Sequence, residues 1–225
     1  MTVALAQTFP SAQVYGLDLA PVPQTSTNPR PPNVQYIQGN IHDLLGQHPD
    51  LQPGTFDYIY SRYLLATATP WLKYLDQIAT LLNPGGWLEM TESSITFHSG
   101  SGEAMPVSPG GWFETLCKDS RAQGIDLQLG DSLLRYLEYS SEYDSVAQET
   151  FRNELRALPA TPELWTIQGQ HEEILRWLAR KVCGACRSKE EVGSLVKGIE
   201  EYFERDYRLG DHFLVYDVVA RKRRV

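Results

Sequence analysis

An aspartate at the end of a predicted strand is the residue of this sequence best placed to hold a ligand. Residues 12–19 (AQVYGLDL) predict a strand that ends at Asp18 and Leu19. A carboxylate at that position can accept two hydrogen bonds from a vicinal diol, which is how nucleoside-binding α/β folds hold ribose. The alternative is an aspartate that only caps a turn. We predict that Asp18 and its neighbour Leu19 contact a nucleoside.

Two further side chains could handle a proton or position a substrate. His98 lies in a connection, residues 96–111, that is rich in glycine, serine and proline, as lids and substrate loops are. It is the candidate general base if the accepting group is a hydroxyl, although a lone loop histidine often takes no part in chemistry. Glu92 follows a glycine-containing turn, where an acid either positions a substrate or is simply solvated.

The predicted fold is organised around a βαβ unit in residues 56–92. A β-rich run is followed by a segment with apolar residues at helical spacing, which reaches Leu82. The sequence NPGG at 83–86 ends that helix, because proline cannot continue it and glycine tolerates positive φ. A second β-rich run starts at Trp87. Strand, helix and strand in this order predict a right-handed parallel crossover.

The remaining chain predicts one earlier strand and a largely helical second half. Residues 1–9 fit the end of a helix and residues 33–38 fit a strand. Asp131 is the expected cap of a short helix, and Ser188 opens another with a capping box. The further elements that we expect are helices at 112–122, 130–137, 162–182 and 188–205, and strands at 143–151 and 212–220.

The sequence FDYIYSRYL…LLNPGGWLEMTE resembles the second half of a class I S-adenosylmethionine-dependent methyltransferase. It is most similar to fungal methyltransferases of secondary metabolism, the family that includes the velvet-complex regulator. The resemblance implies an α/β fold with a Rossmann-like methyltransferase sheet, flanking helices, and a C-terminal helical insertion before a closing antiparallel strand. It also implies S-adenosyl-L-methionine as the cofactor.

The resemblance assigns further cofactor contacts. Related proteins carry, after the strand that matches 33–38, an acid that meets the adenine amino group. Here Asn40 holds that position, followed by Ile41, and its amide oxygen can still accept the amino hydrogen. The strand that ends near Ser61 lies beside the methionine moiety in the family, so Ser61 and Arg62 are candidate pocket residues. Arg62 could contact a carboxylate of the cofactor or form a structural salt bridge with a neighbouring acid.

The resemblance begins late in the family's pattern. The family has a first strand and a glycine-rich loop before a helix like residues 1–9, and this sequence contains no such motif. Without that strand, the strand ending at Asp18 and the strand starting at Phe56 would each leave an edge unpaired. Three explanations compete: the true chain is longer, the protein is a degenerate member that no longer methylates, or a partner subunit completes the sheet.

Composition limits the partners and the location. A net charge of −8 over 225 residues argues against general nucleic-acid binding, which needs a basic surface. No apolar run approaches the ~18 residues of a membrane span. Three cysteines do not make a disulfide framework, so we expect a reducing compartment, the cytoplasm, with the nucleus not excluded. Cys183 and Cys186 have zinc-like spacing but lack a second ligand pair, so no metal is expected.

We therefore predict a single methyltransferase-like domain over 1–225, with cofactor-side β/α units in 1–95 and the lid, helical insertion and closing antiparallel strands in 96–225. The expected reaction is methyl transfer to a small-molecule acceptor, with in-line positioning in a dry pocket as the main contribution of the enzyme. Two alternatives keep the fold without methylation. One is a cyclase, and the other is a regulatory or scaffolding subunit that pairs with another protein through an exposed sheet edge. For any of these functions, a homodimer or a methyltransferase-like partner could complete the sheet.

Overall fold

Two compact units make up this protein, residues Met1–Thr55 and Phe56–Val225. The structure, a computed structural model, describes residues 1–21, 30–64, 70–105, 107–154, 165–206 and 210–224. Most of the predicted loop at 21–32 therefore lies outside the described residues.

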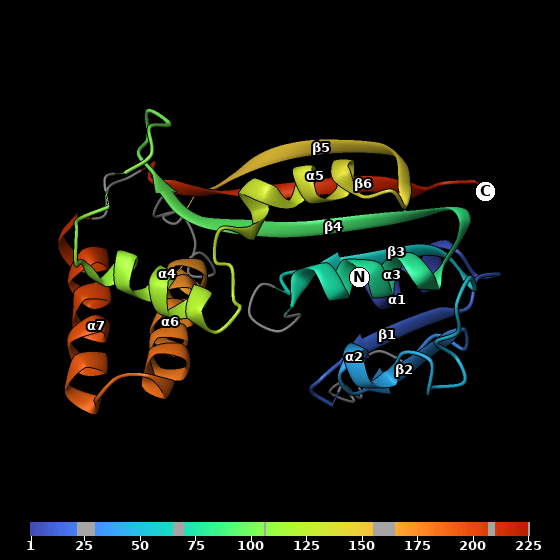
Figure 1. The fold of residues 1–225 in the computed structure, drawn as a ribbon, viewed down its shortest axis with the longest axis horizontal. Helices are drawn as coiled ribbons and strands as arrows, with labels where there is room; N and C mark the ends of the chain where they lie inside the picture. Colours follow the sequence, from blue (N-terminus) through green and yellow to red (C-terminus); the bar gives the residue numbers. More distant parts are fainter. Residues whose placement is uncertain (22–29, 65–69, 106, 155–164, 207–209, 225) are drawn as a thin grey trace. The chain divides into compact units, whose positions relative to one another are not determined.

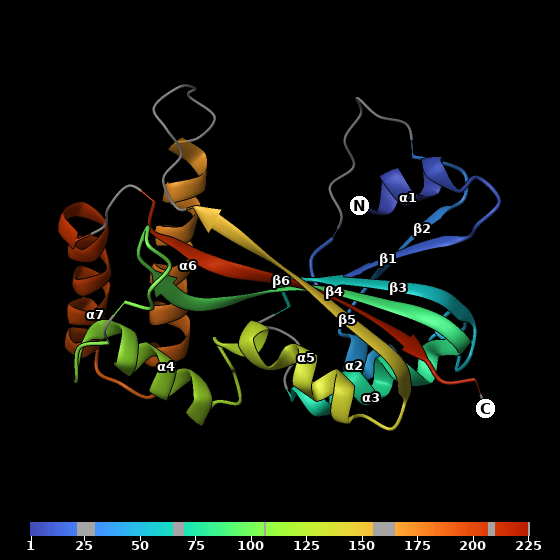
Figure 2. The same ribbon diagram turned by 90° about the horizontal axis from the view of Figure 1, so that it is seen from above.

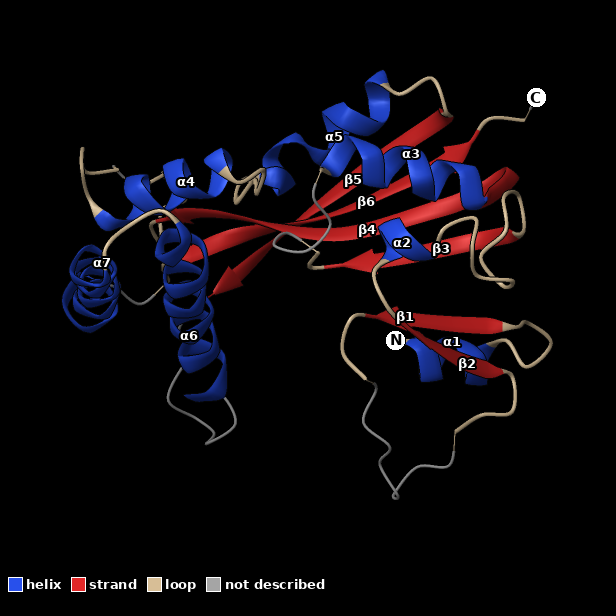
Figure 3. Ribbon diagram, turned by 60° about the horizontal axis from the view of Figure 1, so that its bottom comes forward, coloured by secondary structure: helices blue, strands red, loops and turns tan. Residues whose placement is uncertain are grey.

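The first unit is built on two parallel strands. Its elements are α1 (Thr2–Thr8), β1 (Val14–Asp18), β2 (Val34–Gln38) and α2 (Ile41–Leu44). β1 and β2 pair in parallel from Val14↔Val34 to Asp18↔Gln38, as Figure 3 shows. Since the carboxyl ends of parallel strands meet at one edge, Asp18 and the residues after β2 lie at the same edge. The predicted helix and both predicted strands of this unit are confirmed.

The second unit contains a four-stranded sheet in the order β3-β4-β6-β5. β3 (Phe56–Arg62) is parallel to β4 (Leu82–His98), and α3 (Trp71–Leu81) connects them. β6 (His212–Lys222) is antiparallel to both β4 and β5 (Tyr143–Glu154). Figure 1 shows the long β4, β5 and β6 arrows side by side. The predicted parallel strand–helix–strand connection and the closing antiparallel strand are confirmed. Among the described residues, the strand that the family places between β1 and β3 has no counterpart.

The helices of the second unit form two groups. α3 and α5 (Leu129–Tyr139) lie against one face of the sheet (Figure 2), and α5 packs through leucines spaced four residues apart, Leu129, Leu133 and Leu137. The other group consists of α4 (Trp112–Ala122), α6 (Trp165–Val182), a 3₁₀ helix (Cys183–Ala185), α7 (Lys189–Glu201) and a π-helical turn (Tyr202–Asp206). The predicted capping box opens α7, because Ser188 and Glu191 exchange side-chain and backbone hydrogen bonds.

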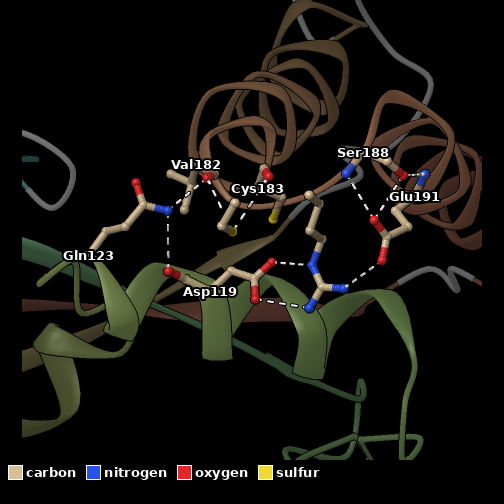
Figure 4. A network of polar contacts seen from close by, with 8 residues as sticks. Asp119, Gln123, Val182, Cys183, Ser188 and Glu191 are labelled. Atoms are coloured by element: carbon tan, nitrogen blue, oxygen red, sulfur yellow. Dashed lines mark hydrogen bonds and ion pairs between the residues drawn. The ribbon is translucent and has the colours of Figure 1, made fainter.

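A polar network joins α4 to the turn between α6 and α7 (Figure 4). The guanidinium of Arg187 donates to both carboxylate oxygens of Asp119 and also pairs with Glu191. The bonds from Arg187 hold the pKa of the buried Asp119 below its usual range. Gln123 Nε2 adds a hydrogen bond of 2.7 Å to the carbonyl of Val182. The network fixes the three helices of this group against one another.

An aromatic cluster lies where the end of β4 meets the same helices. The Phe97 ring is 5.2 Å from the Tyr202 ring and 6.3 Å from the Phe203 ring, centroid to centroid. Trp112 and Phe113 at the start of α4 approach Phe97 at 6.1 and 5.8 Å. Edge-to-face arrangements prevail, as the aromatic quadrupole favours. The two residues that open the π-helical turn thus complete this part of the core.

Three predictions of local structure are wrong in detail. β4 runs to His98, so the connection expected from residue 96 begins later, because Phe97 and His98 pair with Phe213 and His212 of β6. α5 begins at Leu129, and Asp131 is not its cap. Both carboxylate oxygens of Asp131 instead accept hydrogen bonds of 2.6 Å, from Ser94 Oγ and Tyr216 Oη. The α-helix from residue 189 ends at 201, short of the expected 205.

Two kinds of feature are absent from the part of the chain that the structure describes. None of its helices has the length and apolarity that crossing a membrane requires. It also contains no group of three or more His, Cys, Asp or Glu side chains that could hold a metal ion. Cys117, Cys183 and Cys186 are free thiols.

The packing of α5 on the sheet yields a matched pair of glycine substitutions. A Cβ at Gly130 would lie 2.8 Å from the Ser93 carbonyl carbon and 2.9 Å from the Ser94 nitrogen, so Gly130→Ala forces the helix outward. A Cβ at Gly193 of α7 would meet nothing within 4 Å. We expect Gly130→Ala to lower the free energy of unfolding by about 1–3 kcal/mol and Gly193→Ala to raise it by about 0.5–1 kcal/mol.

Urea unfolding followed by tryptophan fluorescence measures both changes, because all five tryptophans belong to residues 56–225. Equal effects of the two substitutions would contradict the close approach of α5 to β4.

Candidate functional site

Asp18 combines a turn-capping bond with a free acceptor. It is exposed at the end of β1, and its Oδ1 accepts a 2.9 Å hydrogen bond from the backbone nitrogen of Ala20. Its main-chain oxygen accepts from Gly39 at 2.9 Å, which holds the end of β1 to the residues after β2. The cap uses one carboxylate oxygen, and the other has no hydrogen-bond partner in the described part of the chain, so it can accept from a ligand. Leu19 follows with 52% of its surface exposed.

Asn40 has a structural role that the sequence analysis did not assign. It is the N-cap of α2, and its Oδ1 accepts a 2.9 Å hydrogen bond from the backbone nitrogen of His42. Asparagine is among the strongest N-cap residues, so this use could have been expected from its place before a helix. An amide oxygen has two lone pairs, and the second remains available to an amino group. Ile41 begins α2 and is half-buried.

Ser61 and Arg62 point to opposite faces of the second-unit sheet, because side chains alternate along a strand. Ser61 pairs with Met90 and is buried, whereas Arg62 pairs with Thr91 and is exposed. The Arg62 guanidinium lies 4.9 Å from the centre of the Tyr63 ring, and it forms no ion pair with an acid of the described residues. Of the two alternatives for Arg62, the structural salt bridge is therefore not seen there. Tyr63 itself has a φ of 52°, which is strained for a residue other than glycine.

Glu92 lies on the buried face together with Ser61. Its side chain is fully shielded from solvent, and its Oε1 accepts a 2.8 Å hydrogen bond from the backbone nitrogen of Leu64. Its Oε2 and the Ser61 hydroxyl oxygen have no hydrogen-bond partner among the described residues. Burial raises the pKa of Glu92 to about 7, although the Leu64 bond opposes the rise. A half-satisfied buried acid of this kind is a common feature of functional sites.

His98 stands apart from Glu92. It is the last residue of β4, and its ring stacks on that of His212 at 5.5 Å. Its Nδ1 lies 3.0 Å from the Thr96 carbonyl, which can only accept, so Nδ1 carries the proton and Nε2 the lone pair. Glu92 and His98 are six positions apart on one strand, which corresponds to about 20 Å. The structure does not bring these two candidates together, so they cannot serve one reacting atom.

Two residues of α3 that the sequence analysis did not single out join Ser61 and Glu92. Trp71 and Tyr74 are buried, and their rings meet edge-to-face at 5.5 Å. Burial raises the pKa of Tyr74 to about 12; the approach of Ser61 lowers it, and the nearby charge of Glu92 raises it further. Trp71 Nε1 has no hydrogen-bond partner among the described residues. The helical spacing of the apolar residues in this segment indicated only that they pack in the core.

The raised pKa of Glu92 predicts a distinctive pH dependence of stability. The native state binds this proton more tightly than the unfolded state, so Glu92 destabilises the fold increasingly as pH rises from about 4.5 towards 7. We expect Glu92→Gln to remove this dependence. Its free energy of unfolding, relative to the parent protein, rises by about 1–3 kcal/mol between pH 5 and pH 8 in urea titrations. Parallel curves for the two proteins would show that the acid is not held protonated by burial.

Comparisons with known proteins agree with this architecture. A family model described as "Methyltransferase domain" matches residues 1–138. The methyltransferase str2 of Strobilurus tenacellus is 26% identical over 202 residues, covering 89% of this chain and 69% of that protein. The methyltransferase str3 of the same organism is 29% identical over 163 residues, covering 72% and 56%.

A solved structure shares the fold. It is a phosphoethanolamine N-methyltransferase 2 of Haemonchus contortus in complex with S-adenosylhomocysteine. It aligns with 98% of this chain and 46% of that chain, at a TM-score of 0.50 and 16% identity. The family model matches more than half of the residues, and the fold is the one that the resemblance to fungal class I methyltransferases implied. The chain therefore belongs to the methyltransferase-domain family.

Proposed function

We propose that this protein transfers a methyl group from S-adenosyl-L-methionine to a small-molecule acceptor in fungal secondary metabolism. The family match supports the reaction class. The observation that carries the proposal is Asp18, an exposed acid at the carboxyl edge of a parallel strand pair, one of whose carboxylate oxygens has no partner among the described residues. Ligands of open α/β sheets bind at that edge, and a free carboxylate oxygen fits a ribose hydroxyl.

The described residues fit the parts of this cofactor as follows. Asp18 would accept hydrogen bonds from the ribose, and Leu19 and Ile41 would contact the adenine through apolar side chains. The remaining lone pair of Asn40 Oδ1 would accept from the adenine amino group. Ser61 and Arg62, on opposite faces at the end of β3 in the second unit, stay predicted contacts of the methionine portion from the family resemblance alone. The cofactor supplies an electrophilic methyl group when bound. The residues of the chain orient the reactants and exclude water.

A base is needed only if the accepting atom must lose a proton. Glu92 and His98 are both proposed for that role, and their separation means that only one of them can fill it. We favour Glu92, because the carboxyl ends of the parallel strands β3 and β4 are the expected binding edge and Glu92 directly follows the last paired residue there, Thr91. The three free thiols suit a reducing compartment, and we propose the cytoplasm.

Cofactor binding is the direct test. We expect calorimetric titration of the full chain with S-adenosylhomocysteine to give saturable binding. Asp18→Asn should weaken it about tenfold or more, because a charge-assisted hydrogen bond is replaced by a neutral one. Asp43→Asn, an exposed acid of α2 in the same unit, is the matched control and should leave the affinity unchanged. An absence of binding by the parent protein would favour the cyclase or regulatory alternatives.

Association with a second chain is a separate proposal. In the described residues β1 pairs only with β2, and β3 only with β4, so each has one strand neighbour. An open strand edge is a ready site for pairing with another chain. We expect light scattering to give about twice the 25.4 kDa of one chain. A stable 25.4 kDa species that binds S-adenosylhomocysteine would exclude the homodimer as a requirement.

A further inference from the structure

Three polar atoms beneath α3 have no hydrogen-bond partner among the described residues: Ser61 Oγ, Glu92 Oε2 and Trp71 Nε1. Their side chains are 5%, 0% and 7% exposed, so solvent does not satisfy them. A buried polar atom without a partner destabilises a fold by about 1–3 kcal/mol, and native structures contain few of them. Their presence in one region requires a reason other than stability.

These three residues and Tyr74 form one site, which we name the Glu92 cluster: Ser61, Trp71, Tyr74 and Glu92. Ser61 is paired across the ladder with Met90, and Glu92 lies two residues further along that strand on the same face. Tyr74 is close enough to both Ser61 and Glu92 for each to change the pKa of its hydroxyl. Trp71 packs edge-to-face against Tyr74. A carboxylate oxygen, the hydroxyl groups of Ser61 and Tyr74, and two aromatic rings, one of which carries an indole N–H, therefore share one dry environment.

This combination of groups has a clear chemical complement. A protonated amine donates hydrogen bonds to a carboxylate and to a hydroxyl, and its charge is attracted to the carboxylate and to aromatic faces. A metal ion is a poorer complement, because the described residues provide no third ligand. A positive charge near Glu92 would also draw its pKa back down, which would offset the destabilisation that the empty site carries.

We propose that the Glu92 cluster is a binding subsite for a protonated amine, with Glu92 Oε2 and Ser61 Oγ as its acceptors. This inference rests on the proposed function, because it names the chemistry of a ligand that takes part in the same reaction. Two sources share this chemistry: the α-amino group of the cofactor and an amine of the acceptor substrate.

Binding measurements with three variants separate these sources. Glu92→Gln and Ser61→Ala remove the two acceptors, and Glu89→Gln, on the same strand but on the opposite face, is the matched control. The first probe is S-adenosylhomocysteine, compared with the analogue that lacks its α-amino group. The second is benzylamine, compared with benzyl alcohol, titrated with and without saturating S-adenosylhomocysteine.

If the cofactor amine occupies the subsite, Glu92→Gln weakens the binding of S-adenosylhomocysteine by about 10- to 100-fold. The binding of the analogue without the amino group hardly changes. If an acceptor amine occupies it, S-adenosylhomocysteine binding is unchanged, and benzylamine binding, absent for benzyl alcohol, is lost in Glu92→Gln. Ser61→Ala gives a smaller loss of the same kind, and it replaces Glu92→Gln if that variant does not fold. Glu89→Gln binds as the parent does.

The inference is overturned if neither amine probe distinguishes Glu92→Gln from the parent protein, since the cluster is then a structural site filled by buried water. Failure of the proposed function appears differently. The parent protein would not bind S-adenosylhomocysteine at all, while the titration of benzylamine without it would still decide whether the subsite takes an amine.

Discussion

Hydrogen bonding along both edges of β4 is the interaction on which the second unit depends. Parallel bonds to β3 reach Arg62↔Thr91, and antiparallel bonds to β6 continue as far as His98↔His212. Because side chains alternate along a strand, these two registers place Met90, Glu92 and Ser94 together on one face. A shift of one residue would exchange the two faces and move Glu92 away from α3. The pairing of β4 thus determines the fold and the chemistry of the candidate site together.

Acids of the second unit show how differently the same carboxyl group can be used. Asp119 is satisfied by the fork of Arg187 and holds three helices together. Asp131 has both oxygens occupied by Ser94 and Tyr216, which ties α5 to the sheet. Glu92 is the exception, since it is the most shielded of the three and only one of its oxygens has a partner among the described residues. The hydrogen bonds of Asp119 and Asp131 stabilise the fold, whereas the burial of Glu92 destabilises it.

Much of the architecture could be predicted because it depends on local signals. The capping box at Ser188 needed no tertiary information. The same holds for the positive φ of 82° at Gly85, which lies in the irregular start of β4 before Trp87. The full length of β4 could not be predicted, because residues 96–98 are held as strand by β6, more than a hundred positions later in the chain. The role of Asp131 was missed for the same reason, since its partners lie on two other strands.

Which residues belong to the candidate site could be predicted from the sequence, but how their side chains lie relative to one another could be predicted much less. Asp18 and Glu92 stood out by type and position, and the capping role of Asn40 could have been expected from its place before a helix. The sequence could not reveal that Ser61 shares a buried face with Glu92, or that Tyr74 lies beside both of them. Each of these facts depends on strand register or helix docking. Long-range packing decides them, and a single sequence read along its length does not contain it.

The π-helical turn at Tyr202–Asp206 places a demand on chain length as well as on residue type. A turn of this kind contains one residue more than an α-helical path of the same span, and the surplus rotates the side chains that adjoin it. Here the adjoining side chains are Tyr202 and Phe203, which close around Phe97. Deleting one non-aromatic residue of this turn would leave Tyr202, Phe203 and Phe97 in the chain but would rotate the first two rings away from the third. Insertions and deletions, rather than substitutions, are therefore the changes that this corner of the protein tolerates least.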